Sequence, residues 1–239
     1  MKTTRYQKIF ITGALGFVGR ALAECYRAFG AEACGLDVRA DSALNIVAGD
    51  VSKPEAWQSA MDGCDLVIHT AAIVTNNVAR EEAWRVNVLG ARRVLDAAIR
   101  ARAKRFIHIS SLAAMRFNVE DRADESAPVM PTGNPYVDTK IASEHVVLAA
   151  HAKGEIACTI IRPADVYGPG SRPWTVIPAQ MIQKGLFLLP AHGKGIFRAI
   201  YIDDLVNGIM LSAEKDEGAG QIFILGGEQA VTCEIFFGH

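Results

Sequence analysis

The sequence predicts an α/β protein built on a doubly wound parallel β-sheet, and three features of the chain support this fold class. Short apolar runs alternate with longer segments of helical periodicity, which is the pattern of successive strand–helix–strand units. Several apolar runs do not alternate with polar residues, as expected for parallel strands that helices cover on both faces. The first run leads directly into a glycine-rich turn and then a helical pattern.

The predicted elements follow one another along the first two thirds of the chain. We expect strands at residues 8–12, 33–37, 45–48, 66–70, 105–110 and 156–162. We expect helices between them, at residues 16–29, 54–61, 79–103 and 136–153. Ser52 is expected to cap the helix that begins at Pro54.

The texture of the chain changes at residue 165, where glycine and proline begin to interrupt every periodic pattern. We therefore divide the chain into a regular α/β domain, residues 1–164, and a small loop-rich region, residues 165–239. The segment 234–239 resembles the first turn of a helix that is then cut off, so we expect this second region to be truncated.

The composition indicates a soluble globular protein. The 239 residues are 50% apolar and carry a net charge of -1 with no basic block, so we expect no nucleic-acid partner. No run approaches the length of a membrane span and no signal peptide is evident, so we expect a cytoplasmic protein with no membrane partner. The five scattered cysteines suit a reducing compartment, and their spacing predicts no metal site.

A dinucleotide site is predicted where the first strand ends. Gly13, Gly16 and Gly19 have the spacing G-x-x-G-x-x-G at a strand-to-helix turn, with Phe17 and Val18 between the last two. Glycines there permit a tight turn and a close approach of the backbone to a pyrophosphate, whose charge the helix N-terminus receives. A purely structural glycine-rich turn is the alternative.

An acidic residue at the end of the second strand argues against that alternative. Asp37 lies 18 residues after Gly19, where a carboxylate would hold the adenosine ribose and repel a 2′-phosphate. NAD is therefore favoured as the cofactor over NADP, and Arg39 keeps NADP open.

Several motifs now stand in a fixed order along nearly the whole chain. They are Thr12-Gly13-x-x-Gly16-x-x-Gly19, Gly49-Asp50-Val51, His69-Thr70-Ala71-Ala72, Asn87-Val88-x-Gly90, Ser110-Ser111, Tyr136-x-x-x-Lys140, Arg162-Pro163-x-x-Val166-Tyr167-Gly168-Pro169 and Tyr201-Ile202-Asp203-Asp204-Leu205. In this ordered set the chain resembles the extended short-chain dehydrogenase/reductases, which include nucleotide-sugar epimerases, dehydratases and 3β-hydroxysteroid dehydrogenase-like reductases. The resemblance implies that residues 1–164 form a Rossmann-type NAD(P)-binding domain with the catalytic residues. It also implies that residues 165–239 bind the substrate and are interleaved with the Rossmann core.

The resemblance also implies cofactor contacts outside the glycine motif, at Asp50, Val51, Thr70, Ala71, Ala72, Asn87 and Pro163. Asp50 would accept a hydrogen bond from the adenine amine, and Thr70 would pass beside the phosphates and ribose. For Asn87, a buried amide that ties strand to helix is an equal interpretation. His69 is expected to be a packed residue at a strand end.

Tyr136 and Lys140 are four residues apart in a helical segment, which puts both side chains on one face. A free phenol has a pKa of about 10, and a neighbouring ammonium together with a positive nicotinamide ring would bring that pKa toward the working range. By the resemblance, Ser111 would hold the substrate oxygen, Tyr136 would exchange the proton and Lys140 would also bond to the nicotinamide ribose. Hydride would pass to or from the nicotinamide.

The reaction class is less tightly predicted than the triad. Leu112-Ala113-Ala114 follows Ser111 where dehydratases of the family carry an Asp-Glu pair, so dehydration is disfavoured. Arg198, with Arg172 nearby, stands where epimerases clamp a diphosphate, whereas the apolar residues between positions 174 and 189 suit a reductase. Asp165 departs from the Asn, Gly or Thr usual in the family and is, with Arg198, a candidate substrate contact.

We therefore favour a dehydrogenase or reductase that interconverts an alcohol and a carbonyl on a small organic molecule. An epimerase that holds NAD tightly is the first alternative, and a non-catalytic NAD(P)-binding protein is the second. We expect a homodimer formed through the helices at 79–103 and 136–153.

Overall fold

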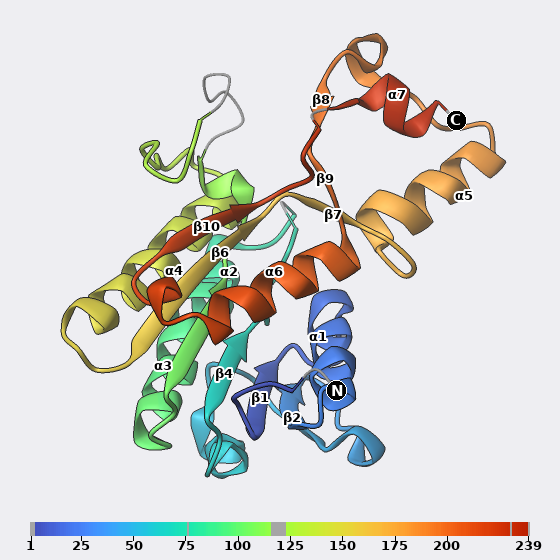
Figure 1. The fold of residues 1–239 in the computed structure, drawn as a ribbon. Coiled ribbons are helices and arrows are strands. Elements are labelled where there is room, and N and C mark those ends of the chain that lie inside the picture. The colour runs from blue at the N-terminus through green and yellow to red at the C-terminus, as the bar shows by residue number, and fades with distance from the viewer. Residues whose placement is uncertain (1–2, 76, 116–122, 230, 239) are drawn as a thin grey trace.

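The computed structural model of the chain describes residues 3–75, 77–115, 123–229 and 231–238. A parallel sheet of seven strands lies at its centre, in the order β10-β6-β5-β4-β1-β2-β3 (Figure 1). The strands are β1 Lys8–Thr12, β2 Glu32–Asp37, β3 Ile46–Ala48, β4 Leu66–His69, β5 Arg105–Ile109, β6 Ala157–Pro163 and β10 Ile222–Leu225. The order reverses between β1 and β4, and a doubly wound sheet binds its ligand at this crevice.

Two layers of helices cover the sheet (Figure 1). One contains α1 (Phe17–Ala28) and α6 (Ile202–Glu214), and the other contains α2 (Arg80–Trp84), α3 (Gly90–Arg100) and α4 (Pro135–Ala152). Along β1, Ile9 and Ile11 join the core under α1 and α6, while Phe10 joins the core under α3 and α4. Successive strand residues point to opposite faces, so both faces of a fully buried strand must be apolar.

The predicted fold class and doubly wound sheet are confirmed, and each predicted strand agrees with an observed one to within one residue at each end. The helix predicted at 54–61 is wrong, because two short 3₁₀ turns, Pro54–Ala56 and Gln58–Met61, occupy this segment. Trp57 separates them with φ −143°; its indole is buried and its Nε1 donates to the Asp50 carbonyl oxygen at 2.8 Å. Ser52 does not cap a helix, since its hydroxyl donates to the Asp50 carboxylate instead.

Residues 165–201, 226–229 and 231–238 form what we call the C-terminal lobe, seen at the upper right of Figure 1. Its elements are β7 Asp165–Tyr167, α5 Ile177–Gln183, β8 Ile196–Phe197, β9 Ala199–Tyr201, β11 Val231–Thr232 and α7 Cys233–Phe237. Between the two parts of the lobe, the chain returns to the sheet as α6 and β10. The strand β10, which lies within residues 165–239, was not predicted from the sequence.

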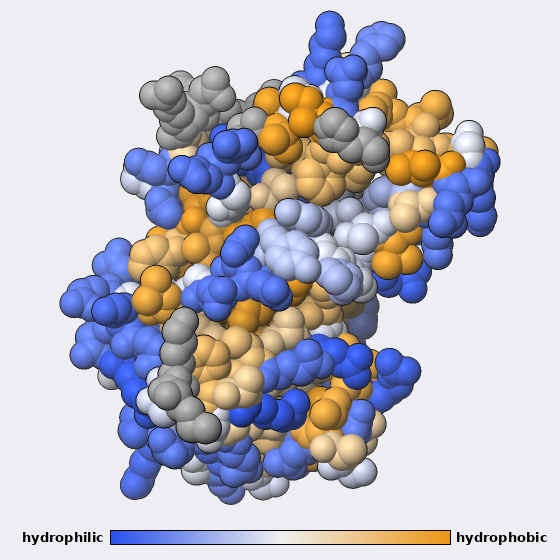
Figure 2. Space-filling view, turned by 45° about the vertical axis from the view of Figure 1, so that its right-hand side comes forward, coloured by the Kyte–Doolittle hydropathy of each residue, from blue (hydrophilic) through white to orange (hydrophobic). Residues whose placement is uncertain are grey.

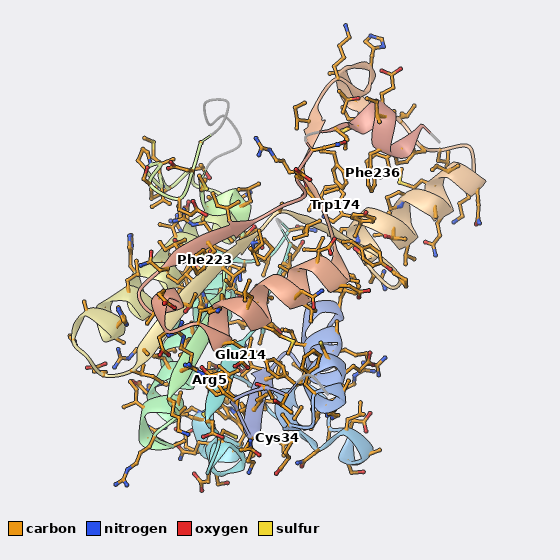
Figure 3. All side chains as sticks on the ribbon, in the orientation of Figure 1. Arg5, Cys34, Trp174, Glu214, Phe223 and Phe236 are labelled. Atoms are coloured by element: carbon orange, nitrogen blue, oxygen red, sulfur yellow. The ribbon has the colours of Figure 1, made fainter. Side chains whose placement is uncertain are left out.

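Aromatic rings hold the C-terminal lobe together. The ring of Phe197 lies 4.9 Å from that of Trp174 and 4.3 Å from that of Phe236, measured between centroids. Trp174 and Phe236 thus approach each other from distant parts of the chain (Figure 3). Apolar side chains are also exposed on this lobe, and Figure 2 shows apolar surface in the upper part of the molecule. They are Ile177, Met181, Ile182, Leu186, Leu188, Ile196 and Ile235.

The outer strand β10 is covered at one point by the segment before α4. There the Glu125 carboxylate accepts a hydrogen bond from the Ile224 backbone N–H at 2.8 Å. Among the residues that the structure describes, no helix has the length and apolar character that a bilayer span requires.

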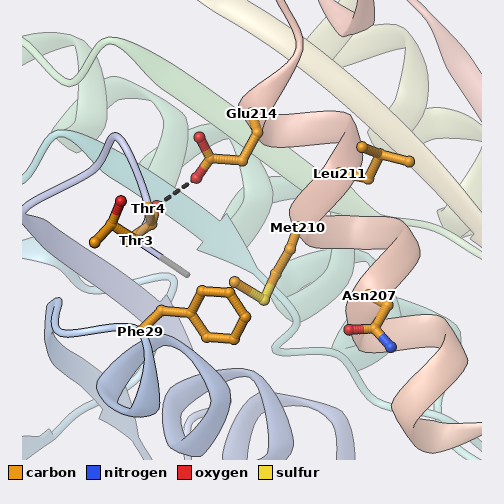
Figure 4. A pocket seen from close by; sticks show the side chains of 7 residues that line it. All are labelled: Thr3, Thr4, Phe29, Asn207, Met210, Leu211 and Glu214. Carbon is orange, nitrogen blue, oxygen red and sulfur yellow. Dashed lines mark hydrogen bonds between the residues drawn. The ribbon is translucent and has the colours of Figure 1, made fainter. Parts of the chain in front are cut away.

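A cavity of about 220 Å³ lies between the C-terminal end of α1 and the side of α6 (Figure 4). It is lined by Thr3, Thr4, Phe29, Asn207, Met210, Leu211 and Glu214. Because α1 starts at the carboxyl end of β1, its last turn lies beside the amino ends of the strands. This cavity therefore lies at the amino ends of the strands, whereas the predicted dinucleotide turn lies at their carboxyl ends.

Candidate active site

The glycine motif forms a turn that only glycine can make. Gly13 has φ +68°, in the left-handed region, and its amide donates to the Leu36 carbonyl oxygen at 2.8 Å. A Cβ on Gly19 would lie 2.2 Å from the Gly13 carbonyl oxygen, so the turn and the first helical turn of α1 are in direct backbone contact. α1 has neither a side-chain cap nor an acidic residue in its first turn, so its N-terminal N–H groups are available to an anion. The turn fits a dinucleotide pyrophosphate.

Asp37 lies beside this turn at the end of β2. Its Oδ2 accepts from the Leu15 N–H at 2.9 Å, and its Oδ1 accepts from the Val38 N–H at 2.8 Å. The carboxylate is half-buried and tied to the glycine loop, whereas Arg39 is exposed. The geometry therefore holds Asp37 at the place where the adenosine ribose was expected.

The Asp50 carboxylate belongs to a small polar cluster that the sequence motif did not predict. Its Oδ1 accepts from the N–H and hydroxyl of Ser52, and its Oδ2 pairs with Arg85. Burial alone would raise the pKa of Asp50, but the bonds from Ser52 and Arg85 outweigh it and hold the pKa below its usual range. One lone pair of Oδ2 remains for an adenine amine. Val51 is buried at the next position.

Thr70 and Asn87 organise the loop that follows β4. The Thr70 hydroxyl donates to the Thr12 carbonyl oxygen at 2.7 Å, which brings residues 70–72 against the glycine turn. Asn87 accepts from the Ile73 N–H at 2.8 Å and donates to the Ile73 carbonyl oxygen and to Thr139. Both amide hydrogens of Asn87 are therefore used within the protein, which matches a tie between strand end and helix. A direct bond to the cofactor would have to replace one of them.

Ser111, Tyr136 and Lys140 meet beyond the carboxyl end of β5. Asn134 begins α4 by accepting from the Tyr136 and Val137 N–H groups, with Pro135 at the first helical position, so Tyr136 stands in the first turn. The Lys140 Nζ donates to the Ile109 carbonyl oxygen at 2.8 Å and lies 5.9 Å from the centre of the Tyr136 ring. The Ser111 side chain interacts with the Tyr136 phenol.

Burial governs the titration of this group of residues. It raises the pKa of the Tyr136 phenol, and the interaction with Ser111 only partly offsets that effect. The expected lowering of the phenol pKa is therefore absent from the protein alone, because desolvation exceeds the opposing effect of the Ser111 hydroxyl. Burial also lowers the pKa of Lys140 to about 8, against an opposing effect of Glu144. A pKa of about 8 leaves Lys140 mostly protonated at neutral pH.

Two buried histidines lie beneath the site, on β4 and β5. His69 shares a hydrogen bond of 2.7 Å with the Thr12 hydroxyl, and its ring stacks on His108 with centroids 5.5 Å apart. His108 shares a hydrogen bond with Ser143 at 2.9 Å. Burial depresses the pKa of both imidazoles, so both are neutral, and His69 is a packed strand-end residue as expected.

Asp165 and Arg198 lie side by side where the chain leaves β6. The Asp165 N–H donates to the Arg198 carbonyl oxygen at 2.8 Å, through the pairing of β7 with β9. Burial raises the pKa of Asp165 to about 6, while the Arg198 side chain is exposed. Pro163 ends β6 two residues earlier and is buried. Arg172 is exposed at the start of a π-type turn.

Comparison with known proteins gives a consistent family. Residues 9–226 match the NAD dependent epimerase/dehydratase family. Sterol demethylase protein B of Methylococcus capsulatus is 30% identical over 94% of this chain and 71% of its own length. The 4-hydroxy-2-methyl-3-oxo-4-farnesyl-3,4-dihydroquinoline-1-oxide ketoreductase of Stigmatella aurantiaca is 28% identical over 91% of this chain and 67% of its own length.

A solved structure agrees with these relatives. It is a short-chain dehydrogenase/reductase superfamily protein from Agrobacterium tumefaciens with bound NAD. It superposes with a TM-score of 0.82 and 25% identity over 97% of this chain and 81% of that one. The extent of the family match and the 30% identity to a relative show that the chain belongs to the NAD dependent epimerase/dehydratase family.

Proposed function

We propose that the chain is an NAD-dependent oxidoreductase that interconverts an alcohol and a carbonyl on an apolar organic molecule. The observation that carries this proposal is the meeting of Ser111, Tyr136 and Lys140 beyond β5, with Lys140 Nζ 5.9 Å from the Tyr136 ring. A hydroxyl, a phenol and a buried ammonium at one point are the groups that a carbonyl reduction needs for its oxygen atom. A protein that only binds a nucleotide needs none of them.

Each residue of the triad has one task. Tyr136 gives its phenol proton to the carbonyl oxygen in reduction and takes it back from the alcohol in oxidation. Ser111 donates a hydrogen bond to the same oxygen. The protonated Lys140 stabilises the phenolate that the proton transfer leaves on Tyr136. NAD, when bound, supplies or accepts the hydride.

The cofactor contacts of this proposal are those that the sequence motifs predict. Gly13, Gly16 and Gly19 would hold the pyrophosphate at the N-terminus of α1, and Asp37 would hold the adenosine ribose. The Asp37 carboxylate would also repel the extra phosphate of NADP, which supports NAD.

An apolar substrate is supported by the C-terminal lobe and by the relatives. The lobe exposes apolar side chains such as Met181 and Leu186. Contact of apolar side chains with water is unfavourable, so their exposure favours a binding surface for an apolar molecule. The relatives are named as a ketoreductase of a farnesyl-substituted quinoline oxide and a sterol demethylase protein, whose substrates are largely apolar. Asp165, a carboxylate at the edge of the lobe, would repel the diphosphate of a nucleotide sugar.

A nucleotide-sugar epimerase is the second candidate. The exposed Arg198 guanidinium, immediately before β9, is the observation in its favour, since arginine pairs readily with phosphate. Replacing Arg198 by methionine should abolish an epimerase that clamps a diphosphate and should leave a reductase of apolar ketones active. Retention of NAD through purification would favour the epimerase, and free exchange would favour the reductase.

The test of the main proposal is the Tyr136→Phe variant, with Tyr26→Phe as the matched control. Both remove one phenol hydroxyl, and that of Tyr26 is buried in α1 with no hydrogen-bond partner among the described residues. Against a panel of sterol and isoprenoid ketones with NADH, Tyr136→Phe should lose turnover by ~10²-fold or more, while NADH binding by nicotinamide fluorescence stays near wild type. Full activity of Tyr136→Phe would refute the proposal.

The proposal includes a homodimer in a reducing compartment. A groove of about 400 Å³ on α2, α3 and α4 is lined by Glu81, Trp84, Arg85, Val88, Leu89, Arg92 and Val146. Trp84 is 37% and Leu89 is 42% exposed there, and an identical face from a second copy would cover them. The cysteines are free thiols, which suits the cytoplasm.

A further inference from the structure

A buried ion pair stands directly behind the triad. The Glu144 carboxylate accepts two bonds from the Arg162 guanidinium, from Nε to Oε1 at 2.9 Å and from Nη2 to Oε2 at 2.8 Å. The side chains are only 2% and 3% exposed, respectively. The Ser110 hydroxyl donates to the same Oε1 at 2.5 Å. This bidentate pair and its third partner are sealed from water.

The pair joins the three elements that carry the site. Glu144 lies on α4, one helical turn after Lys140, so both side chains share a face. Ser110 directly follows β5 and precedes Ser111, and Arg162 lies on β6 immediately before Pro163. Lys140 itself bonds to the Ile109 carbonyl oxygen, one residue before Ser110. Lys140 and Glu144 therefore form hydrogen bonds with two successive residues, Ile109 and Ser110, at the end of β5.

Stability alone does not explain two buried charges at this place. The desolvation of a buried ion pair roughly cancels its attraction, and apolar replacements of such pairs are often neutral or stabilising. What the pair does provide is a fixed geometry and a fixed electric field. On α4, this field acts on the Lys140 ammonium, which lies one helical turn before Glu144.

The surroundings of Lys140 make Glu144 the dominant charge that acts on it. From β4 and β5 the neutral rings of His69 and His108 face it, and from its own helix the Tyr136 ring and the Glu144 carboxylate do so. From β6 the Arg162 guanidinium stands behind the Glu144 carboxylate. Removing the Glu144 charge should thus make the potential at Lys140 more positive, and removing the Arg162 charge should make it more negative.

We propose that Glu144 and Arg162 are positioning residues, which hold Lys140 and the Ser110–Ser111 strand end in register and keep Lys140 protonated at neutral pH. This inference rests on the proposed function, in which Lys140 acts as the ammonium beside Tyr136. Neither Glu144 nor Arg162 touches the reacting atoms. They act through Lys140 and Ser110.

The test is a titration of the Lys140 Nζ signal by NMR on ¹⁵N-lysine-labelled protein, with the signal assigned by its loss in Lys140→Arg. Glu144→Gln leaves the Arg162 charge unpaired, so the midpoint should fall by about 1 pH unit. Arg162→Met leaves the Glu144 charge unpaired, so the midpoint should rise by about as much. The double variant should fall between wild type and Glu144→Gln, because the nearer charge has the larger effect.

Opposite shifts cannot come from general damage to the fold, which would move both variants in one direction. Asp96→Asn is the matched control: it removes one charge from the half-buried Arg92–Asp96 pair on α3 and should leave the Lys140 midpoint unchanged. If the single variants do not fold, the double variant, which buries no charge, carries the test alone through its lowered midpoint.

Midpoints at the wild-type value in the double variant, or shifts of the same sign in both single variants, would overturn the inference. Provided that Tyr136→Phe abolishes turnover, the kcat/KM pH profile should move with the NMR midpoints in each variant, and a profile that stays fixed would then also overturn the inference. Failure of the proposed function is distinguishable, because it appears as activity of Tyr136→Phe and does not affect the NMR midpoints.

Discussion

Replacing Gly19 by alanine tests whether the glycine turn holds the cofactor. The added Cβ would lie 2.2 Å from the Gly13 carbonyl oxygen and 3.1 Å from Ala14 Cα. Cβ atoms are essentially never closer than 3.0 Å to such neighbours, so the turn and α1 must part by at least about 0.8 Å. Both neighbours are backbone, so no side chain can move aside. Overpacking of this kind costs about 1–3 kcal/mol.

That cost should appear in NADH affinity, because the pyrophosphate contacts both segments that must separate. A penalty of about 1–3 kcal/mol corresponds to a ~5- to 150-fold rise in Kd, measured by nicotinamide fluorescence. Gly16→Ala should weaken binding less, since its Cβ would lie 3.0 Å from the Gly13 carbonyl oxygen. Gly195→Ala is the control, with its Cβ 3.9 Å from the nearest atom, the Cys233 sulfur. Wild-type affinity in Gly19→Ala, alongside a folded protein by thermal melting, would refute the reasoning.

Three further perturbations follow from features of the structure. Asp37→Ala should relax the preference for NADH over NADPH in paired fluorescence titrations, because the carboxylate that repels a 2′-phosphate is gone; an unchanged ratio would assign the selectivity elsewhere. Trp84→Glu should convert a dimer into a monomer in light scattering, whereas Leu211→Glu, at an exposed position of α6, should not; a wild-type monomer would contradict the dimer. Burial raises the folded-state pKa of Asp165 to about 6, above its unfolded value, so its stabilising protonated form is lost as the pH rises through 6. Asp165→Asn should therefore raise Tm at pH 8 and change it little at pH 4.5. Asp62→Asn, on the surface, should leave Tm unchanged at both pH values. Equal effects of Asp165→Asn at the two pH values would refute the burial argument.

The parts of the fold that could be predicted from the sequence are those with a repeating physical cause. Ile9, Phe10 and Ile11 are apolar on both faces of β1 because helices cover both faces of the sheet, and this pattern located every strand up to β6. The helix prediction for residues 54–61 was wrong because a tertiary contact, the burial of Trp57, sets the structure of this segment. β10 is short and half-buried, and it follows an irregular stretch, so nothing local separated it from a loop.

The candidate site divides in the same way. Spacing placed Tyr136 and Lys140 on one helix face, and the glycine spacing placed the turn before α1. The Arg85–Asp50 and Arg162–Glu144 pairs join residues 35 and 18 positions apart, which no local pattern reveals. A Glu four residues after Lys140 was the available signal for the second pair, since that spacing repeats the face on which Tyr136 and Lys140 lie. The balance of desolvation and charge at Tyr136 also depends on burial, which the sequence does not specify.

The contact between Glu125 and Ile224 has a consequence for the solubility of the chain. The outer strand β10 reads Ile-Phe-Ile-Leu, and an open edge of that composition is a template onto which other chains can add strands. A carboxylate on the Ile224 N–H takes one of the donors that such an addition needs, and it places a negative charge on the edge. The segment before α4 thus acts as a guard against intermolecular β-sheet growth, a task separate from any role beside the active site.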